Sequence, residues 1–410
     1  MFLDIIKKAL IWHYENWITP YIYIWIVNPF YRRTISNKVK KIRKKEKIDV
    51  MFIVTEIGPW KTEQLFKTMV RHNRFHPFIG ISASMENPSF KSDVKKYITD
   101  NGYECVDIDM FPKQSADIIF YQKPYQWCYS KQIQYRNYLK SLFCYVNYGF
   151  HTILTEWVTN QELYKFVWQY YFECNMEFIM PAKYNIITGV PMQDKLMCAS
   201  KNNLDPWHRS EKKRIIYAPH HTIGENHAHG LATSSFLENA DIMVDLMHKY
   251  KEQVQWAFKP HPILYQKLIK VWGKKKTDEY YSEWKNSGIS QYESGSYDGL
   301  FAFSDAMIHD CVSFVIEYHY THNPVLYLTR TEGLEINRTS MSREAYDLHY
   351  KGHTRKEIEQ FIENVINGVD PLKEKREDFF RRCLIPPHGK TACENIINSI
   401  LGIEEYKNQK

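Results

Sequence analysis

Four histidines lie close together in the stretch 217–230, which reads YAPHHTIGENHAHG: His220, His221, His227 and His229. Imidazoles at this density can bind zinc, donate hydrogen bonds to a phosphate, or belong to an ordinary polar loop. Zinc fits poorly, because neighbouring side chains on an extended backbone point to opposite sides and no Cys or carboxylate stands at a zinc-motif spacing. We therefore expect no metal ion here. We expect His220 and His221 to bind substrate phosphate, and His227 and His229 to lie in a mobile loop over the site, with a merely polar loop as the alternative.

A fifth histidine stands between two prolines in the stretch 258–262, FKPHP. The prolines restrict the backbone on both sides of His261, so its imidazole would be held in place at low entropic cost. Lys259 lies two residues before it. A cation and an imidazole at the end of a strand suit a pyrophosphate, whose charge must be stabilised as it leaves. A histidine that caps a turn is the alternative.

A third stretch, FSDAMIHDCVSFVIEYHYTHNPVLYL at 303–328, passes from a predicted strand into a predicted helix near Asp310 and Ser313. Glu317 follows Ser313 by four residues and so shares its helical face. A Ser hydroxyl and a helix N-terminus can hold a phosphate, and an acidic residue one turn later can accept hydrogen bonds from ribose hydroxyls. A helix cap followed by an ordinary exposed Glu is the alternative.

The elements that position these residues alternate in type along the chain. Short apolar runs at 48–56, 76–84, 104–111 and 116–125 are separated by helix-like segments of about 10 to 15 residues, which is the pattern of a parallel sheet with helices on both faces. The alternation restarts at 214–219 and 254–258 and ends with the strand at 324–328. Ligands of such sheets bind beyond the carboxyl ends of the strands, where the three stretches above are expected.

The chain has 410 residues, which is too long for one ordinary core and predicts two domains. The polar, proline-containing stretch SKNNLDPWHRS at 200–210 is typical of a linker. We therefore expect an α/β protein with two Rossmann-like, doubly wound domains. Their predicted ranges are 46–205 for an amino-terminal acceptor domain and 206–410 for a carboxyl-terminal nucleotide-donor domain.

The net charge of +7 comes from one segment, because nine Lys or Arg and one Glu lie between Arg32 and Lys47. Residues 1–30 before it are rich in Trp, Tyr and Ile, but their longest apolar run, 18–27, falls well short of the about 20 residues that span a membrane. Aromatic residues beside a polybasic run are typical of a protein on an anionic cytoplasmic leaflet. We expect residues 1–45 to be a membrane-associating segment kept in the mature chain. A helix packed on the protein itself, followed by a basic linker, is the alternative.

Two further classes of protein are disfavoured by composition. A nucleic-acid-binding protein would spread its basic residues over a face of the fold, and no DNA- or RNA-binding motif is present. The eight cysteines are scattered without a CxxC pair, which predicts free thiols in a reducing compartment rather than a disulfide framework.

The order YAPHHT, FKPHP and SDAMIHDCVSFVIEY followed by NPVLYL, covering about 215–328, resembles the carboxyl half of the CDP-glycerol glycerophosphotransferases, the teichoic-acid and capsule polymerases and primases. That family's pattern has a strand ending in Ala-Pro-Thr, a basic residue before His-Pro, and an acidic and serine-containing segment that leads to a Pro-Val strand. The resemblance implies the glycosyltransferase-B architecture, with two Rossmann-like domains facing a cleft. It also implies work on the cytoplasmic face of the membrane.

The resemblance also implies roles for single residues. His261 would contact the pyrophosphate of a CDP-activated alcohol, and Asp310, Ser313 and Glu317 fall on the acidic, serine and acidic positions of the family's last block. Val312 replaces the first of two serines in that block, and His220 stands where the family often has Thr.

The family's general base belongs to a Trp-His-Gly turn, which would align with Tyr148-Gly149 of VNYGFHTILTE. The histidine expected there is absent. His151, three residues after Tyr148, is therefore our candidate base.

The reaction implied is attack by an acceptor hydroxyl on the β-phosphorus of a CDP-alcohol such as CDP-glycerol, which forms a phosphodiester and releases CMP. The acceptor would be a cell-surface glycan or a lipid-linked molecule, and no cofactor or metal is expected. One alternative is a glycosyltransferase of the same architecture that uses a nucleotide-sugar. Another is a non-catalytic partner in capsule assembly that keeps the nucleotide pocket.

Overall fold

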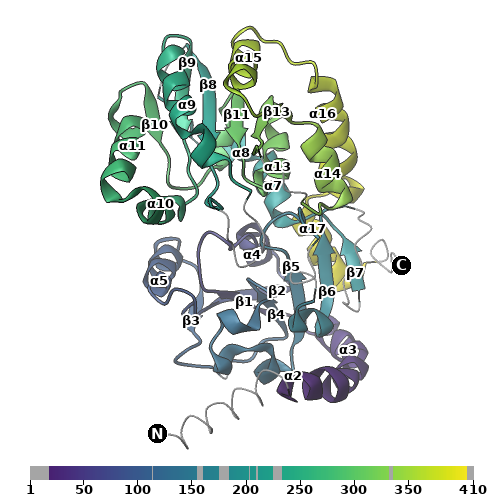
Figure 1. Cartoon of the computed structure of the whole chain (residues 1–410). Coiled ribbons are helices and arrows are strands. Elements are labelled where there is room, and N and C mark those ends of the chain that lie inside the picture. Colours follow the sequence, from purple (N-terminus) through teal and green to yellow (C-terminus); the bar gives the residue numbers. More distant parts are fainter. Residues whose placement is uncertain are drawn as a thin grey trace, which may run out of the picture. The chain divides into compact units, whose positions relative to one another are not determined.

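The computed structural model describes residues 18–112, 114–154, 160–174, 184–202, 204–208, 211–224, 233–331 and 336–403. The chain divides into two compact units, here called unit 1 and unit 2 (Figure 1). Unit 1 comprises Met1–Gly149, Thr155–Asp194 and Pro386–Lys410, and unit 2 comprises Phe150–Leu154 and Lys195–Ile385. Three segments therefore differ from the predicted domain ranges: 150–154 and 195–205 belong to unit 2, and 386–410 belongs to unit 1.

Unit 1 is built on a seven-stranded sheet in the order β3-β2-β1-β4-β5-β6-β7, in which every strand pair is parallel. The four runs predicted as strands between 48 and 125 are confirmed as β1 to β4. Strands such as β1 are buried almost throughout, as expected of a parallel sheet covered on both faces. The strands are β1 (Ile48–Val54), β2 (Phe75–Ile81), β3 (Cys105–Asp107), β4 (Ile118–Tyr121), β5 (Leu142–Val146), β6 (Val167–Phe172) and β7 (Tyr184–Ile187).

Unit 2 is built on a six-stranded parallel sheet in the order β10-β9-β8-β11-β12-β13. Alternate residues of β8 face two separate cores, since Ile215 and Tyr217 belong to one cluster and Ile216 and Ala218 to the other. Both faces of the sheet are thus covered, and the predicted doubly wound arrangement is confirmed. The strands are β8 (Lys213–Ala218), β9 (Val254–Phe258), β10 (Ser290–Tyr292), β11 (Ala306–His309), β12 (Val325–Leu328) and β13 (Tyr350–Gly352).

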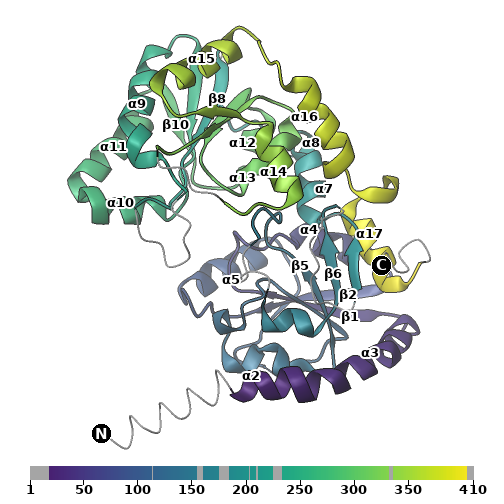
Figure 2. The ribbon, with the colours of Figure 1, turned by 45° about the vertical axis from the view of Figure 1, so that its right-hand side comes forward.

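Helices connect the strands in both units (Figures 1 and 2). Those of unit 1 are α2 (Thr19–Ile22), α3 (Asn28–Arg43), α4 (Glu63–Val70), α5 (Phe90–Asp100) and α17 (Ala392–Leu401), while α7 (Pro191–Met197) spans the boundary. Those of unit 2 are α8 (Ala199–Asn202), α9 (Phe236–Lys249), α10 (Leu264–Trp272), α11 (Lys274–Asn286), α12 (Asp298–Ala302), α13 (Phe314–Glu317), α14 (Ser340–Asp347), α15 (Arg355–Ile366) and α16 (Lys373–Phe379).

The carboxyl-terminal helix α17 joins unit 1 through its N-terminus. The backbone N–H groups of Ala392 and Cys393 donate to the carboxylate of Asp194 at 2.7 and 2.8 Å. The amide of Asn395 donates to the carbonyl of Thr188 at 2.9 Å. These partners are about 200 residues away in the sequence. Local sequence patterns therefore did not indicate that α17 belongs to unit 1.

Helix α3 lies along unit 1 (purple in Figure 2). Tyr31 is its anchor: the hydroxyl donates to the carbonyl of Ser141 at 3.1 Å, and the ring stacks on Phe143 with centroids 5.8 Å apart. Ile35 and Ile42 of the same face are also buried. Part of the predicted membrane-associating segment is therefore an integral layer of unit 1. In the described residues, no helix is long and apolar enough to cross a bilayer.

All eight cysteines are free thiols, as the sequence predicted. Several are buried among apolar side chains, where the thiol behaves as a small hydrophobic group.

Three buried histidines of unit 2 lie in contact, and one of them, His309, is the last residue of β11. His349 is 5.2 Å from His309 and 5.0 Å from His319 between ring centroids. Rings of His319 and His349 both donate to the carbonyl of Ala345, at 3.1 and 2.8 Å. Burial lowers the pKa of His309 and of His319 to about 3 and lowers that of His349 as well. All three are therefore neutral in the folded protein at physiological pH.

Because these three histidines are buried in their neutral form, the stability of unit 2 depends on pH. Below the ordinary histidine pKa of about 6.5, the unfolded chain binds protons that the folded chain does not, so stability is lost as pH falls towards about 3. We expect His319→Gln to reduce the slope of unfolding free energy against pH by about 1.4 kcal/mol per pH unit near pH 5. Urea unfolding at pH 7, 6 and 5 measures this slope. The surface variant His248→Gln is the control, and an equal slope in His319→Gln and the original protein would contradict the prediction.

Candidate active site

The loops that carry the predicted site residues meet at one edge of the unit 2 sheet. From β8 the strand order runs outward in two directions, through β9 to β10 and through β11 to β13. The loops after β8 and β11 therefore leave the sheet in different directions, and ligands of doubly wound sheets bind at such a point. His220 and His221 follow β8, His261 follows β9, and Asp310 follows β11.

Asp310 holds the loops at this edge of the sheet together. Its carboxylate is fully buried and accepts hydrogen bonds from the backbone N–H of His220 at 2.6 Å, from the Ser234 hydroxyl at 2.7 Å and from the backbone N–H of Ser235 at 2.8 Å. Burial raises the pKa of Asp310 to about 6, although these donors oppose the rise. The structure thus gives Asp310 the role of a positioning residue that ties the loop after β8 to the start of α9.

The imidazoles of His220, His221 and His261 form a cluster. Ring centroids are 4.3 Å apart for His220 and His221, 4.1 Å for His221 and His261, and 4.9 Å for His220 and His261. One ring nitrogen from each lies within 4.8 Å of the others, so this trio could hold a metal ion. The expectation that adjacent His220 and His221 point to opposite sides is therefore wrong. Strand β8 ends at Ala218, so the alternation of a strand does not apply beyond it.

His261 is held rigidly and is uncharged. Its backbone N–H donates to the carbonyl of Pro219 at 3.0 Å, and its Nδ1 accepts from the backbone N–H of Ile263 at 3.2 Å. Burial, together with the nearby His221 and Lys259, lowers the pKa of His261 to about 3. The bond to Nδ1 favours the tautomer with the proton on Nε2, which makes Nε2–H a neutral hydrogen-bond donor.

Lys259 is 7% exposed, and its ammonium donates to the carbonyl of Gly295 at 2.9 Å. It adds positive charge next to His261 without lying on the open surface. The hydrogen bond to the Gly295 carbonyl fixes the end of the side chain. Lys259 therefore contributes a positive charge at a defined position on this edge of the sheet.

Ser313 and Glu317 lie at the two ends of α13, a single turn that begins at Phe314. The hydroxyl of Ser313 is 3.1 Å from Cys311 Sγ. Glu317 is only 2% exposed and hydrogen-bonds with the partly buried Tyr297. The alternative of an ordinary exposed Glu is therefore excluded.

His151 lies in a segment that the structure assigns to unit 2. Its carbonyl accepts from the Thr339 hydroxyl at 2.7 Å, and the N–H of Leu154, three residues later, donates to the carbonyl of Asn337 at 2.8 Å. The imidazole is 6% exposed. The sequence predicts this histidine in the amino-terminal domain (46–205), but these long-range bonds join its segment to unit 2. His227 and His229 lie outside the described residues.

Sequence reasoning missed Ser234 and Ser235 as parts of the site. Both contact Asp310, and the sequence TSSF before a helix is a recognisable cap signal. What the sequence does not indicate is that the partner of these serines is a carboxylate about 75 residues away.

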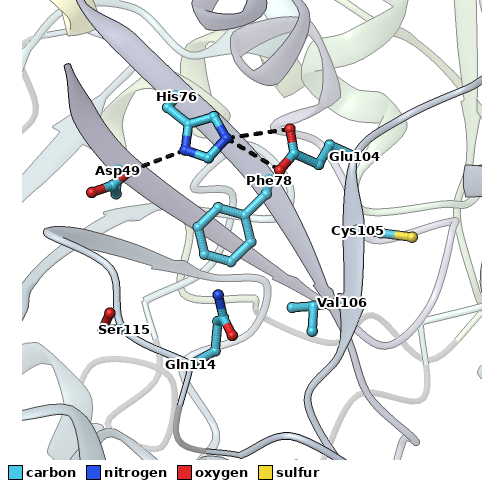
Figure 3. A pocket seen from close by; sticks show the side chains of 8 residues that line it. All are labelled: Asp49, His76, Phe78, Glu104, Cys105, Val106, Gln114 and Ser115. Carbon is cyan, nitrogen blue, oxygen red and sulfur yellow. Dashed lines mark hydrogen bonds and ion pairs between the residues drawn. The ribbon is translucent and has the colours of Figure 1, made fainter.

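A second polar cluster lies in unit 1, at the edge of its sheet where the strands begin. It lines a cavity of about 240 Å³ (Figure 3). His76 stands between two carboxylates, with Nδ1 2.9 Å from Asp49 and Nε2 3.1 Å from Glu104. Hydrogen bonding to Asp49 in particular raises the pKa of His76. Ligands of parallel sheets bind at the carboxyl edge, so this cluster is not assigned to the reaction.

Comparison with solved structures shows proteins of similar fold. A UDP-N-acetylglucosamine 2-epimerase structure matches with a TM-score of 0.53 at 12% identity, covering 89% of this chain and 99% of the other. The epimerase of Neisseria meningitidis bound to UDP-GlcNAc gives 0.52 at 12% identity, covering 86% and 99%. A structure of the wall teichoic acid polymerase TagF gives 0.49 at 13% identity, covering 90% and 95%. At these identities the two epimerases show the fold alone, which is two Rossmann-like domains of the glycosyltransferase-B class.

No curated protein sequence matches the chain. A family model, in contrast, matches residues 157–402, more than half of the chain, and is that of the CDP-glycerol:poly(glycerophosphate) glycerophosphotransferases. This range contains every site residue proposed from the sequence except His151. The chain therefore belongs to the CDP-glycerol:poly(glycerophosphate) glycerophosphotransferase family and is an enzyme of that type.

Proposed function

We propose that this enzyme transfers an alditol phosphate, such as glycerol phosphate, from a CDP-activated donor to a hydroxyl of a glycan or lipid-linked acceptor. The observation that carries the proposal is the cluster of His220, His221 and His261 beside Lys259 at the ligand-binding edge of unit 2. The family match supports a donor of the CDP-glycerol type. Together they supply hydrogen-bond donors and positive charge where a diphosphate would bind.

In the proposed reaction the acceptor oxygen forms a bond to the β-phosphorus, and the bond from that phosphorus to the oxygen of CMP breaks. The bonding electrons leave with CMP, so the enzyme must stabilise charge on its phosphate. His261 Nε2–H and the imidazoles of His220 and His221 provide this stabilisation as preorganised donors, and Lys259 adds charge. Because His261 is already neutral and fixed, little reorganisation is needed during transfer.

Removing one such donor tests the proposal. We expect His261→Ala to lower the rate of CMP release by about 100- to 1000-fold, which corresponds to about 2.7 to 4 kcal/mol of barrier. His227→Ala and His229→Ala should cost far less, and the surface variant His248→Ala should be unchanged. CMP is measured with a CDP-glycerol donor.

Other outcomes of this assay contradict the proposal. Release of a nucleoside diphosphate from a nucleotide-sugar would indicate a glycosyltransferase. CDP binding without turnover by any donor would indicate a non-catalytic assembly partner. Equal losses at His220, His221 and His261 that added zinc restores would indicate a metal site.

His151 is the proposed base for the acceptor proton, and Ser313 and Glu317 are the proposed contacts for donor phosphate and ribose. We expect His151→Ala to lower turnover by about 100- to 10,000-fold while donor affinity stays nearly constant. The acidic limb of the rate profile should also follow an imidazole. Near-normal turnover in His151→Ala, with loss of the acidic limb in His220→Ala or His221→Ala instead, would move the base to the loop after β8.

We further propose that the enzyme works as a peripheral protein on the cytoplasmic membrane face. The support is the outward face of the first helices, where Tyr21, Trp25, Ile26 and Phe30 are exposed by 57% or more. Arg32, Lys38, Arg43 and Lys45 are engaged by unit 1 itself. The exposed Arg33, Lys40, Lys41, Lys44 and Lys47 remain for anionic lipid headgroups.

Point variants test membrane binding better than deletion of residues 1–45, because deletion would expose the surface covered by Tyr31 and Ile35. We expect Trp25→Ser combined with Ile26→Ser to weaken binding to phosphatidylglycerol vesicles by at least about tenfold, since each buried apolar side chain contributes about 1.5 to 3 kcal/mol. Val70→Ser, on an exposed part of α4, is the control. Cosedimentation at low and high salt is the measurement. Unchanged sedimentation of the double variant would contradict membrane binding.

A further inference from the structure

Polar and aromatic side chains gather at the carboxyl edge of the unit 1 sheet. The strand order runs outward from β1 through β2 to β3 and, on the other side, through β4 to β7. The loops after β1 and β4 therefore diverge, as those after β8 and β11 do in unit 2. The Gln122 side chain fixes their separation, because its Oε1 accepts from the backbone N–H of Thr55 at 2.9 Å and from the Thr55 hydroxyl at 3.0 Å.

Charged side chains lie in contact at this edge of the unit 1 sheet. Lys123 Nζ lies 2.7 Å from Glu56 Oε1 and 2.7 Å from Glu86 Oε2, and the Ser84 hydroxyl donates to Glu56 at 3.1 Å. Burial alone would lower the pKa of Lys123, but the two carboxylates raise it overall. One ammonium between two carboxylates leaves a formal net charge of −1. The Glu86 side chain keeps 43% of its surface exposed.

An aromatic surface adjoins this charged group. The ring of Trp127 stacks on Tyr125 with centroids 5.8 Å apart and planes 24° from parallel, and 56% of Trp127 is exposed. The hydroxyls of Tyr125 and Tyr148 lie 3.0 Å apart. Cys128, next to Trp127 in sequence, donates its thiol to Glu86 at 3.4 Å. The backbone N–H of Met85 donates to the carbonyl of Cys128 at 3.0 Å, so the segment that carries Trp127 lies beside the segment that carries Glu86.

We propose that this edge of the unit 1 sheet binds a neutral sugar or alditol of the acceptor, which rests on the transfer reaction proposed above. Hydroxyl groups would donate to Glu56 and Glu86, since ionised carboxylates are acceptors only. The apolar face of a sugar ring would lie on Trp127, whose ring offers a large rigid contact area with one polar edge. The net negative charge disfavours phosphate at the same place. The site therefore recognises the hydroxyl-bearing end of the acceptor rather than a phosphodiester chain.

A purely structural network does not account for all of these features. The pair of Glu56 and Lys123 is 15% and 12% exposed and holds two loops together. In contrast, much of the surface of Trp127 and Glu86 is exposed to solvent. A large exposed aromatic ring beside exposed and buried hydrogen-bond acceptors, at the ligand-binding edge of a doubly wound sheet, is typical of a binding site.

Ligand-observed saturation-transfer NMR on the full chain tests the inference. The neutral probe is methyl β-D-glucopyranoside, and the anionic probe is sn-glycerol 3-phosphate. We expect the pyranoside to bind, and Trp127→Ala to weaken it by about 5- to 10-fold, as loss of an aromatic contact does. Phe111→Ala, which removes another exposed aromatic ring of unit 1 (61%), should change nothing.

Glu86→Gln adds a readout that a structural role would not give. The substitution keeps the shape and removes one negative charge, so it should weaken the pyranoside and strengthen glycerol 3-phosphate. Failure of the pyranoside to bind the original protein, or equal binding by Trp127→Ala, overturns the inference. Tighter binding of glycerol 3-phosphate than of the pyranoside to the original protein overturns it as well.

The two proposals fail in different ways. Trp127→Ala should keep CDP binding and should raise the KM for the acceptor with little change in the KM for the donor. If no CDP-alcohol is turned over but the pyranoside still binds at Trp127, the transfer reaction is wrong and the sugar site stands. If CMP is released normally but the KM for the acceptor is unchanged in Trp127→Ala, the sugar site is wrong and the transfer reaction stands.

Discussion

The buried carboxylate of Asp310 is the interaction on which the donor-side geometry depends. It receives hydrogen bonds from the loop after β8 and from the first residues of α9, so one group at the end of β11 fixes two other elements. Removal of such a group would leave several buried donors without a partner, at about 1 to 3 kcal/mol for each. The positions of His220 and His221 follow from this anchor. A carboxylate that would be expensive to bury alone is stabilised by the donors that it organises.

The histidine cluster follows from the same constraint. Because the N–H of His220 is held by Asp310 and the N–H of His261 by Pro219, the two loops approach each other and bring three imidazoles together. His261 is neutral mainly through burial and also because neighbouring imidazoles disfavour each other's protonation. The cluster therefore acts through oriented N–H groups, with Lys259 as the source of positive charge.

In unit 1, a buried polar side chain also links two loops at the carboxyl edge of the sheet, but the charged groups beside it differ. Gln122 bridges its two diverging loops as Asp310 does in unit 2, and Lys123 is neutralised by Glu56 and Glu86. The edge of unit 2 thus offers donors and positive charge, while the edge of unit 1 offers acceptors and a negative charge. Parallel sheets with the same topology can serve different ligands, because the side chains after the strands, and not the strands, define the site.

The sequence by itself determined the strands, their alternation with helices and the three loops that carry the donor-side residues, because the period of apolar residues and the proline positions are local signals. It also indicated the family, since the three motifs and their order are local as well. Only the tertiary structure decided that His220 and His221 share a side, that Glu317 is buried against Tyr297, and that His151 and helix α17 belong to the units opposite to those expected. Each of these facts depends on a hydrogen bond or packing contact with a residue far away in the chain. Local periodicity cannot specify such partners, because it describes which face of an element is buried and not what lies against it.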